Sequence, residues 1–246
     1  MALPKIDAPV YEIDLPLSKK HIRFRPFLVK EQRNLMMALE SDDKVTIEKN
    51  IRQVLHNCTL TENVDIDSLP IIDVEFYFLQ LRARSVGEIV ESSYRCENMV
   101  QLENQTDSSP CGNSMKTKVN LLDIQIEMGA TKEVIKLTDT ISIKLKYPEF
   151  SILEKVSKLT NTTDMAFDMI VNSIEYIYDN QQYYYAKEST NKELSDFIES
   201  LNQDQFSRIE DFFNNLPKLN KKIEIKCSKC GFDHSIEVEG LNSFFD

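Results

Sequence analysis

Cys227-Ser228-Lys229-Cys230-Gly231 is the most informative stretch of this sequence, because a second cysteine pair of the same design, Cys96 and Cys111-Gly112, lies far upstream. Glycine directly after the second cysteine suits a tight turn whose backbone N–H groups point at sulfur. The two turns together supply four thiolates, which is a complete tetrahedral ligand set for zinc. We therefore predict a structural Zn²⁺ site formed by Cys96, Cys111, Cys227 and Cys230.

Both cysteine turns are expected to connect strands, so that they form a zinc ribbon split between two distant segments. The strand-like runs before and after the turns are residues 88–95, 115–121, 222–226 and 234–238. Fourteen residues separate Cys96 from Cys111 where a compact zinc knuckle has two, and this polar insert is predicted to be a loop. A four-cysteine site leaves no open coordination position, so its role would be to organise folding and not to activate water.

Other interpretations of the cysteines stay open at this point. They could form a disulfide or be unrelated buried thiols, and the Cys227/Cys230 spacing also occurs in redox sites. A redox site favours a helix starting at Cys227, whereas an alternating strand follows Gly231. His234 could replace one thiolate, although an ordinary surface histidine is the simpler interpretation. Cys58 follows a helical apolar pattern and is expected to be a small buried side chain.

Composition indicates a globular protein with a substantial core. The chain has 246 residues, 41% of them hydrophobic, and a formal net charge of −11. It contains no run of about 18 apolar residues and no signal-peptide core at its N-terminus, so we expect no membrane segment and synthesis in the cytoplasm with reduced thiols. An acidic chain disfavours nonspecific nucleic-acid binding. One basic segment, residues 218–230, carries five lysines against one glutamate, which we interpret as compensation for the thiolates.

Hydrophobic periodicity predicts an α+β fold. Residues 10–15 and 21–24 read as a strand hairpin, and helical stripes follow within residues 28–39, 47–55 and 71–84. The period then changes to two, with strands expected at 124–127, 134–137 and 141–145. After Pro148 the pattern is helical again, including the apolar series from Phe167 to Ile177, with a short strand at Tyr183–Tyr185 and a capping box at Thr190.

Three parts of the chain are predicted. Residues 1–86 form a strand hairpin with helices, residues 87–147 and 218–246 form the β/zinc-ribbon unit, and residues 148–217 form an inserted helical module. Residues 151–217 carry twelve acidic and five basic side chains, which favours solvated helix faces and, secondarily, docking of a basic partner.

The sequence lacks the recognisable residue patterns of known enzyme active sites. The five glycines form no phosphate-binding cluster, and the three histidines lie in different predicted elements without a nucleophile or a His-Glu-x-x-His motif. We therefore predict a protein that is not an enzyme and has no catalytic residues.

Several stretches resemble the baseplate proteins of T-even-type contractile phage tails. The most specific is Ile22-Arg23-Phe24-Arg25-Pro26-Phe27-Leu28-Val29-Lys30-Glu31, preceded by Leu3-Pro4-Lys5-Ile6. The similarity resumes between Glu193 and Pro217 and ends on Cys227, Cys230-Gly231, Gly240-Leu241 and Phe244-Phe245, so it spans both ends and most of the chain. The long insert before Cys111 departs from the compact pattern.

The resemblance implies a role in virion assembly as a baseplate hub subunit or hub assembly factor, with other tail proteins as partners and no nucleic acid or membrane. The location would be the host cytoplasm during assembly and then the tail baseplate. Aromatic side chains are common in protein interfaces, so we predict partner contacts at Tyr183, Tyr184, Tyr185, Phe244 and Phe245. A transient chaperone absent from the virion and a zinc-ribbon nucleic-acid-binding regulator are the alternatives.

Overall fold

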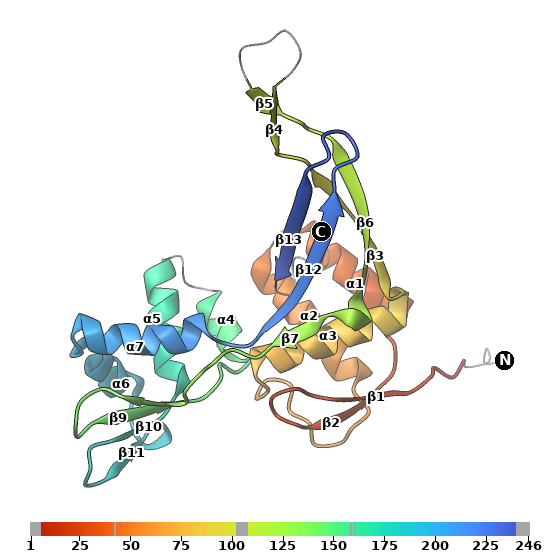
Figure 1. Cartoon of the computed structure of the whole chain (residues 1–246). Helices are drawn as coiled ribbons and strands as arrows, with labels where there is room; N and C mark the ends of the chain where they lie inside the picture. The colour runs from red at the N-terminus through yellow and green to blue at the C-terminus, as the bar shows by residue number, and fades with distance from the viewer. Residues whose placement is uncertain (1–5, 42, 102–107, 158, 160, 240–246) are drawn as a thin grey trace, which may run out of the picture. The chain divides into compact units, whose positions relative to one another are not determined.

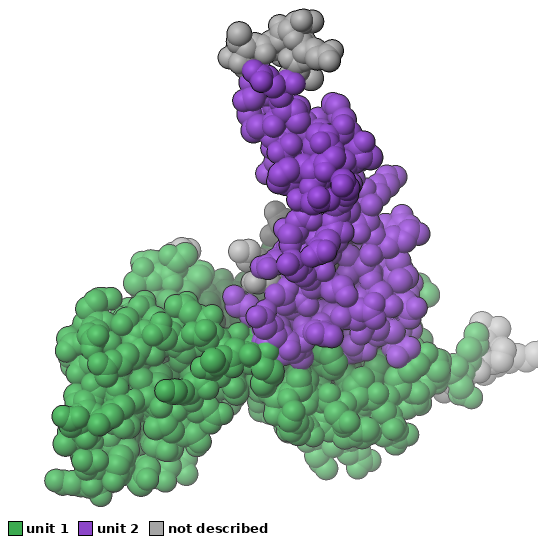
Figure 2. Space-filling view, in the orientation of Figure 1, with its two compact units in different colours: residues 1–78, 128–217 green, residues 79–127, 218–246 purple. Residues whose placement is uncertain are grey.

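The computed structural model describes residues 6–41, 43–101, 108–157, 159 and 161–239. The chain divides into two compact units (Figure 2). One combines residues 1–78 with residues 128–217, and the other combines residues 79–127 with residues 218–246. Helices and several small sheets occur together, which confirms a mixed α and β protein (Figure 1). No helix among the described residues is long and apolar enough to span a bilayer.

The N-terminal part of the first unit is the predicted hairpin followed by helices. Strand β1 (Tyr11–Asp14) pairs antiparallel with β2 (His21–Phe24), and α1 (Val29–Glu40), α2 (Lys44–Cys58) and α3 (Ile71–Val86) follow. Asp43 begins α2 by accepting hydrogen bonds from the N–H groups of Val45 and Thr46. The fully buried side chains here include Leu15, Ile22, Leu55, Cys58, Leu69 and Tyr77, so the prediction that Cys58 is buried is confirmed.

One buried carboxylate connects the hairpin turn to α3. Asp73 is fully buried, and its two oxygens accept the backbone N–H groups of Leu17 and Ser18, each at 2.8 Å. Because both N–H groups lie in the turn between β1 and β2, this side chain fixes the hairpin against the helix.

The second part of the first unit is a four-stranded sheet with helices. Its strand order is β11-β10-β9-β8, and its strands are β8 (Val134–Lys136), β9 (Ser142–Leu145), β10 (Ile174–Tyr178) and β11 (Tyr183–Tyr185). The helices are α4 (Ile152–Val156), α5 (Thr162–Ser173), α6 (Asn191–Glu199) and α7 (Gln203–Asn214), and a short 3₁₀ turn, η2, spans Ala186–Glu188. Its core contains Ile135, Ile143, Leu145, Ile170, Leu194, Ile198, Ile209 and Phe212.

Two sequence predictions are wrong in this region. Ile174 and Ile177 were expected on a helix but lie on β10, where β-branched and aromatic residues pair with β9 across the sheet. Strands β8 and β9 were expected in the zinc-ribbon unit but pair with β10 and each other, so residues 128–147 group with the helical segment. Alternation shows that a segment is a strand without showing which strand it joins.

The second unit contains the C-terminal half of α3, from Leu79 to Val86, and three small sheets. β3 (Ile89–Arg95) pairs with β6 (Ser114–Asn120), and β12 (Lys218–Lys226) pairs with both β13 (Asp233–Glu239) and β7 (Gln125–Glu127). A 3₁₀ turn, η1, spans Leu121–Asp123. The insert predicted as a loop instead begins and ends in a short hairpin, β4 (Met99–Gln101) with β5 (Ser108–Pro110). Both cysteine turns therefore connect antiparallel strands, as the sequence predicted.

Candidate metal centre

The two cysteine turns have the same backbone hydrogen bonds. The Gly112 N–H donates to the Cys96 carbonyl at 2.9 Å, and the Gly231 N–H donates to the Cys227 carbonyl at 2.9 Å. Both glycines have positive φ, +66° and +75°, which a residue with a side chain rarely adopts. In each turn the backbone N–H of the first cysteine donates to the carbonyl of the residue just before the following strand. Cys96 donates to Asn113 and Cys227 donates to Phe232, both at 2.8 Å. The turns are thus two copies of one knuckle.

The long insert leaves the first knuckle intact. The Cys111 N–H donates to the Asn98 carbonyl at 2.8 Å, which holds the two ends of the β4–β5 hairpin together where it joins the turn. The hairpin therefore leaves and rejoins the knuckle at one point. This explains how Cys111 can lie far beyond Cys96 in sequence and still face it.

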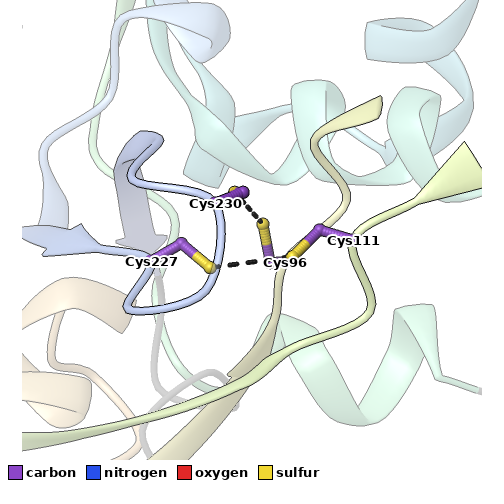
Figure 3. Close-up of side chains that lie close together, drawn as sticks. All are labelled: Cys96, Cys111, Cys227 and Cys230. Carbon is purple, nitrogen blue, oxygen red and sulfur yellow. Dashed lines mark hydrogen bonds between the residues drawn. The ribbon is translucent and has the colours of Figure 1, made fainter. Parts of the chain in front are cut away.

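The four predicted ligand atoms converge (Figure 3). The Sγ atoms of Cys96, Cys111, Cys227 and Cys230 all lie within 4.8 Å of one another. Cys96 and Cys230 have their sulfurs 3.6 Å apart, and Cys111 and Cys227 have theirs 3.8 Å apart. All four cysteines of the cluster are free thiols, and these two separations are well beyond the S–S bond length of about 2.05 Å. Tetrahedral zinc with Zn–S bonds of about 2.3 Å separates its sulfurs by about 3.8 Å. The donor set can hold a metal ion and fits zinc in number, chemistry and spacing.

The surroundings of the cluster favour the thiolate form of Cys227 and oppose the thiolate form of Cys96. The backbone N–H of Cys230, helped by the Lys229 N–H and the Asn113 side chain, lowers the pKa of Cys227 to about 6. Burial raises the pKa of Cys96 to about 12. Because several neighbouring thiolates repel one another, a cation among them would remove the main obstacle to ionising all four.

Three polar side chains border the sulfurs. Asn113 Nδ2 lies 3.4 Å from Cys227 Sγ, Asn98 Nδ2 lies 3.7 Å from Cys230 Sγ, and Lys229 Nζ donates to the Cys111 carbonyl at 3.2 Å. Of the lysines expected to compensate the thiolates, Lys229 thus reaches the cluster. Lys222 and Lys226 instead lie beside Glu224 and Asp233, at 3.8 Å each.

His234 has a closer relation to the cluster than the sequence suggested. Its Nε2 lies 3.1 Å from Cys96 Sγ, and its ring is half-buried against Phe232. The prediction of an ordinary surface histidine is wrong, because β13 returns antiparallel to β12 and carries position 234 back to the cysteine turn. The sequence signal for this placement was the position of His234, four residues after Cys230.

The aromatic residues predicted to contact partners divide into two groups. Tyr183, Tyr184 and Tyr185 form edge strand β11 and are 52%, 42% and 40% exposed. Tyr183 packs against Tyr176 and Tyr178 with ring centroids 5.0 and 4.6 Å apart. Phe244 and Phe245 lie outside the described residues. A role in partner binding stays a prediction for all five residues.

Comparison with known proteins bears on the whole chain and not only on this site. The family model described as T4 bacteriophage base plate protein matches residues 8–246. This chain belongs to that family. Among curated base plate relatives, it is 26% identical over 237 residues to the baseplate hub assembly protein gp26 of Enterobacteria phage T4, covering 96% of this chain and 98% of that protein. No solved structure matches this base plate protein. The resemblance drawn from the Arg25–Glu31 run is confirmed.

Proposed function

We propose that this base plate protein is a non-enzymatic assembly factor or component of the phage tail baseplate hub, which acts by binding other hub proteins. The observation that carries the proposal is the similarity to a baseplate hub assembly protein over nearly the full length of both chains. The match covers 96% of this chain and 98% of that protein, which supports a shared architecture along the matched length.

The proposed role of the cysteine cluster is structural, as a Zn²⁺ site of the split zinc-ribbon type. A metal held by Cys96 and Cys111 from one segment and by Cys227 and Cys230 from the other would tie together two knuckles that are more than a hundred residues apart in sequence. Structural zinc of this kind contributes about 10–16 kcal/mol in small zinc peptides, which is enough to decide whether a small β unit folds. All four positions around the metal would be filled, so the site would supply rigidity and not chemistry.

The exposed tyrosines of β11 are the proposed partner contacts within the described residues. Tyr183 and Tyr185 lie on one face of the strand and are held in place by Tyr176 and Tyr178, so they lose little conformational entropy on binding. We expect Tyr183→Ala with Tyr185→Ala to weaken capture of hub proteins. Val86→Ala, which truncates a side chain of similar exposure on α3, serves as the control.

Copurification tests the proposal. Tagged full-length protein is recovered from phage-infected cells, and bound proteins are identified by mass spectrometry. Baseplate hub proteins should be enriched, and a chain that recovers none of them under conditions where baseplates form would overturn the proposal. Quantitative mass spectrometry of finished particles then distinguishes the two possible roles. A hub component stays in the virion, whereas a transient chaperone that acts only in the host cytoplasm is missing from it.

Nucleic-acid binding is tested in parallel. The lysines of residues 218–230 would have to contact phosphates, but Lys222 and Lys226 already lie beside acidic side chains. We therefore expect no shift of DNA or RNA at physiological salt. Tight binding that weakens steeply with salt would favour the regulator alternative.

A further inference from the structure

The four-stranded sheet of the first unit has a second open edge, opposite β11. Among the described strands, β8 has a neighbour on one side only, β9. Hydrogen bonds from Leu145 N–H to the Glu133 carbonyl and from Leu137 N–H to the Ile141 carbonyl fix which backbone groups face β9. In an antiparallel pair these groups alternate, so the N–H and C=O of Val134 and Lys136 point away from β9. The edge therefore presents the N–H and C=O of Val134 and the N–H of Lys136 to a further strand, whereas the Lys136 carbonyl already accepts a hydrogen bond from Arg208.

The open edge faces a groove and not bulk solvent. Residues 130–132 and 134–136 form one side, and Arg208, Asp211, Phe212 and Asn215 of the α7 region form the other, with a volume of about 620 Å³ between them. Arg208 Nη1 donates to the Lys136 carbonyl at 2.9 Å, which confirms that this carbonyl points toward α7. Val134 is 51% exposed, so an apolar side chain is available beside the unpaired backbone.

The residues that line the groove carry more positive than negative charge, although the protein carries a net charge of −11. Lys132, Lys136 and Arg208 line it with one carboxylate, Asp211. Two of these cations also have exposed acidic neighbours outside the lining, since Lys136 pairs with Asp139 at 3.2 Å and Arg208 pairs with Asp204 at 2.6 Å. A groove with lining cations beside an unpaired strand can recognise a ligand in two ways. The unpaired backbone can hydrogen-bond to an extended peptide, and the cations can attract acidic side chains on that peptide. Nucleic acid would satisfy the cations but could not continue the backbone ladder.

We infer that an extended acidic segment of another baseplate protein binds in this groove by adding a fifth strand beside β8. This inference rests on the proposed function, because it supplies the kind of partner segment that a hub-binding protein would take. The backbone of Val134 would pair with the segment, and Lys132, Lys136 and Arg208 would contact its carboxylates. Arg208 already pairs with Asp204 at 2.6 Å and Lys136 with Asp139 at 3.2 Å, so both cations would be shared between these exposed carboxylates and those of the segment.

The test is site-specific crosslinking in infected cells. A photo-crosslinking amino acid replaces Val134 in the full chain, and a second version carries it at Met36, which is 55% exposed on α1. We expect position 134 to crosslink to one acidic segment of a baseplate protein. Lys132→Glu with Lys136→Glu should lower the yield at least about tenfold, because like charges then face the segment. Lys192→Glu, the same change at an exposed site on α6, should leave the yield within about twofold.

The outcomes separate the inference from the proposed function. If copurification recovers baseplate hub proteins while position 134 crosslinks to none of them, the groove assignment is wrong and the proposed function stands. Crosslinks from position 134 to nucleic acid, to a second copy of this chain or to a basic segment also overturn it. If copurification also recovers no baseplate hub protein, the proposed function itself fails. Lys132→Gln with Lys136→Gln, which should give a smaller loss, replaces the double glutamate variant if circular dichroism shows that the latter is unfolded.

Discussion

Arg25 Nη2 lies 3.0 Å from Oε1 of Glu31, a carboxylate that is 2% exposed. The other oxygen of Glu31 accepts the Leu28 N–H at 2.7 Å, so the side chain caps the start of α1 while it neutralises the arginine. Arg25 also donates to the Pro26 carbonyl and lies 3.7 Å from Cys58 Sγ on α2. The run from Arg25 to Glu31, which carries the resemblance to baseplate proteins, is thus one connected polar network.

This network should make stability depend on acidic pH. Burial alone would raise the pKa of Glu31, but the hydrogen bonds from Arg25 and Leu28 outweigh it and hold the pKa below its ordinary value of 4.5. A lowered carboxylate pKa stabilises the folded state above the unfolded-state value and loses this effect as pH falls through the folded-state value. We expect Glu31→Gln to lower the free energy of unfolding by about 1.5–3 kcal/mol at pH 7. In urea titrations this difference should shrink below pH 4.5, and a difference that is constant with pH would contradict the mechanism.

Glu75 should have the opposite pH dependence. It borders a small cavity of about 110 Å³ lined mainly by apolar side chains such as Ile72, Tyr147 and Met169, and burial raises its pKa to about 7. Because the folded state then holds its proton more tightly than the unfolded state, stability falls as pH rises from about 4.5 to 7. We expect Glu75→Gln to stabilise the protein at pH 8, by at most about 3 kcal/mol, since one pKa unit corresponds to about 1.4 kcal/mol. The two proteins should unfold alike at pH 4, below the ordinary pKa of 4.5, and Glu62→Gln, at an exposed site, should change stability at neither pH.

Loss of a single cysteine should release the metal. Cys227→Ser or Cys230→Ser removes one of four ligands, so bound zinc measured by plasma mass spectrometry should fall from one per chain to none. Hydrogen exchange should then accelerate in β3, β6, β12 and β13 while α1 and α2 stay protected. Cys58→Ala is the matched control, because this cysteine is buried beside Arg25 in the first unit and is not one of the four clustered cysteines. Unchanged zinc in both serine variants would refute the site.

His234 should tune the metal site without being essential to it. Its Nε2 is placed to donate to Cys96 Sγ at 3.1 Å, as polar groups around a metal site often do toward the ligands themselves. We expect His234→Ala to retain one zinc per chain but to weaken its affinity about 10–100-fold in chelator competition. Complete loss of zinc would instead mean that the histidine itself occupies a coordination position.

Gly129 should tolerate no side chain. A Cβ at this position would lie 1.7 Å from the backbone carbonyl oxygen of Asn215, and backbone cannot move aside as a flexible side chain can. We expect Gly129→Ala to lower the thermal midpoint by several degrees, consistent with overpacking costs of about 1–3 kcal/mol. Ala130→Ser, which adds a group at the next position, is the comparison. Equal midpoints for the glycine variant and the unaltered protein would show that the close approach is not required.

Local patterns predicted most of the elements, and long-range pairing accounts for what they missed. The hairpin of β1 and β2, the helices α1 to α3, and the strands on both sides of each cysteine turn follow from periodicity and turn residues within a few positions. The cysteines could be grouped because two similar turns together supply the four thiolates that tetrahedral zinc requires. The sheet partner of β8 and β9 could not be predicted, since alternation fixes a strand's faces and leaves its neighbour open. For the same reason His234, separated from Cys96 by 138 positions, was not placed beside it.

The pairing of β7 with β12 has a consequence for gene architecture. Lys218 lies opposite Glu127, so the chain leaves the second unit and re-enters it at adjacent points on two neighbouring antiparallel strands. Everything between them, 128 to 217, could be deleted and the cut ends rejoined by a tight turn, which would convert two distant strands into an ordinary hairpin. An insertion or exchange of coding sequence at this spot would therefore leave the metal-binding unit's own strand order untouched. The cost would fall on the other unit, where Ile71 and Leu69 are hydrogen-bonded to Pro148 and Phe150.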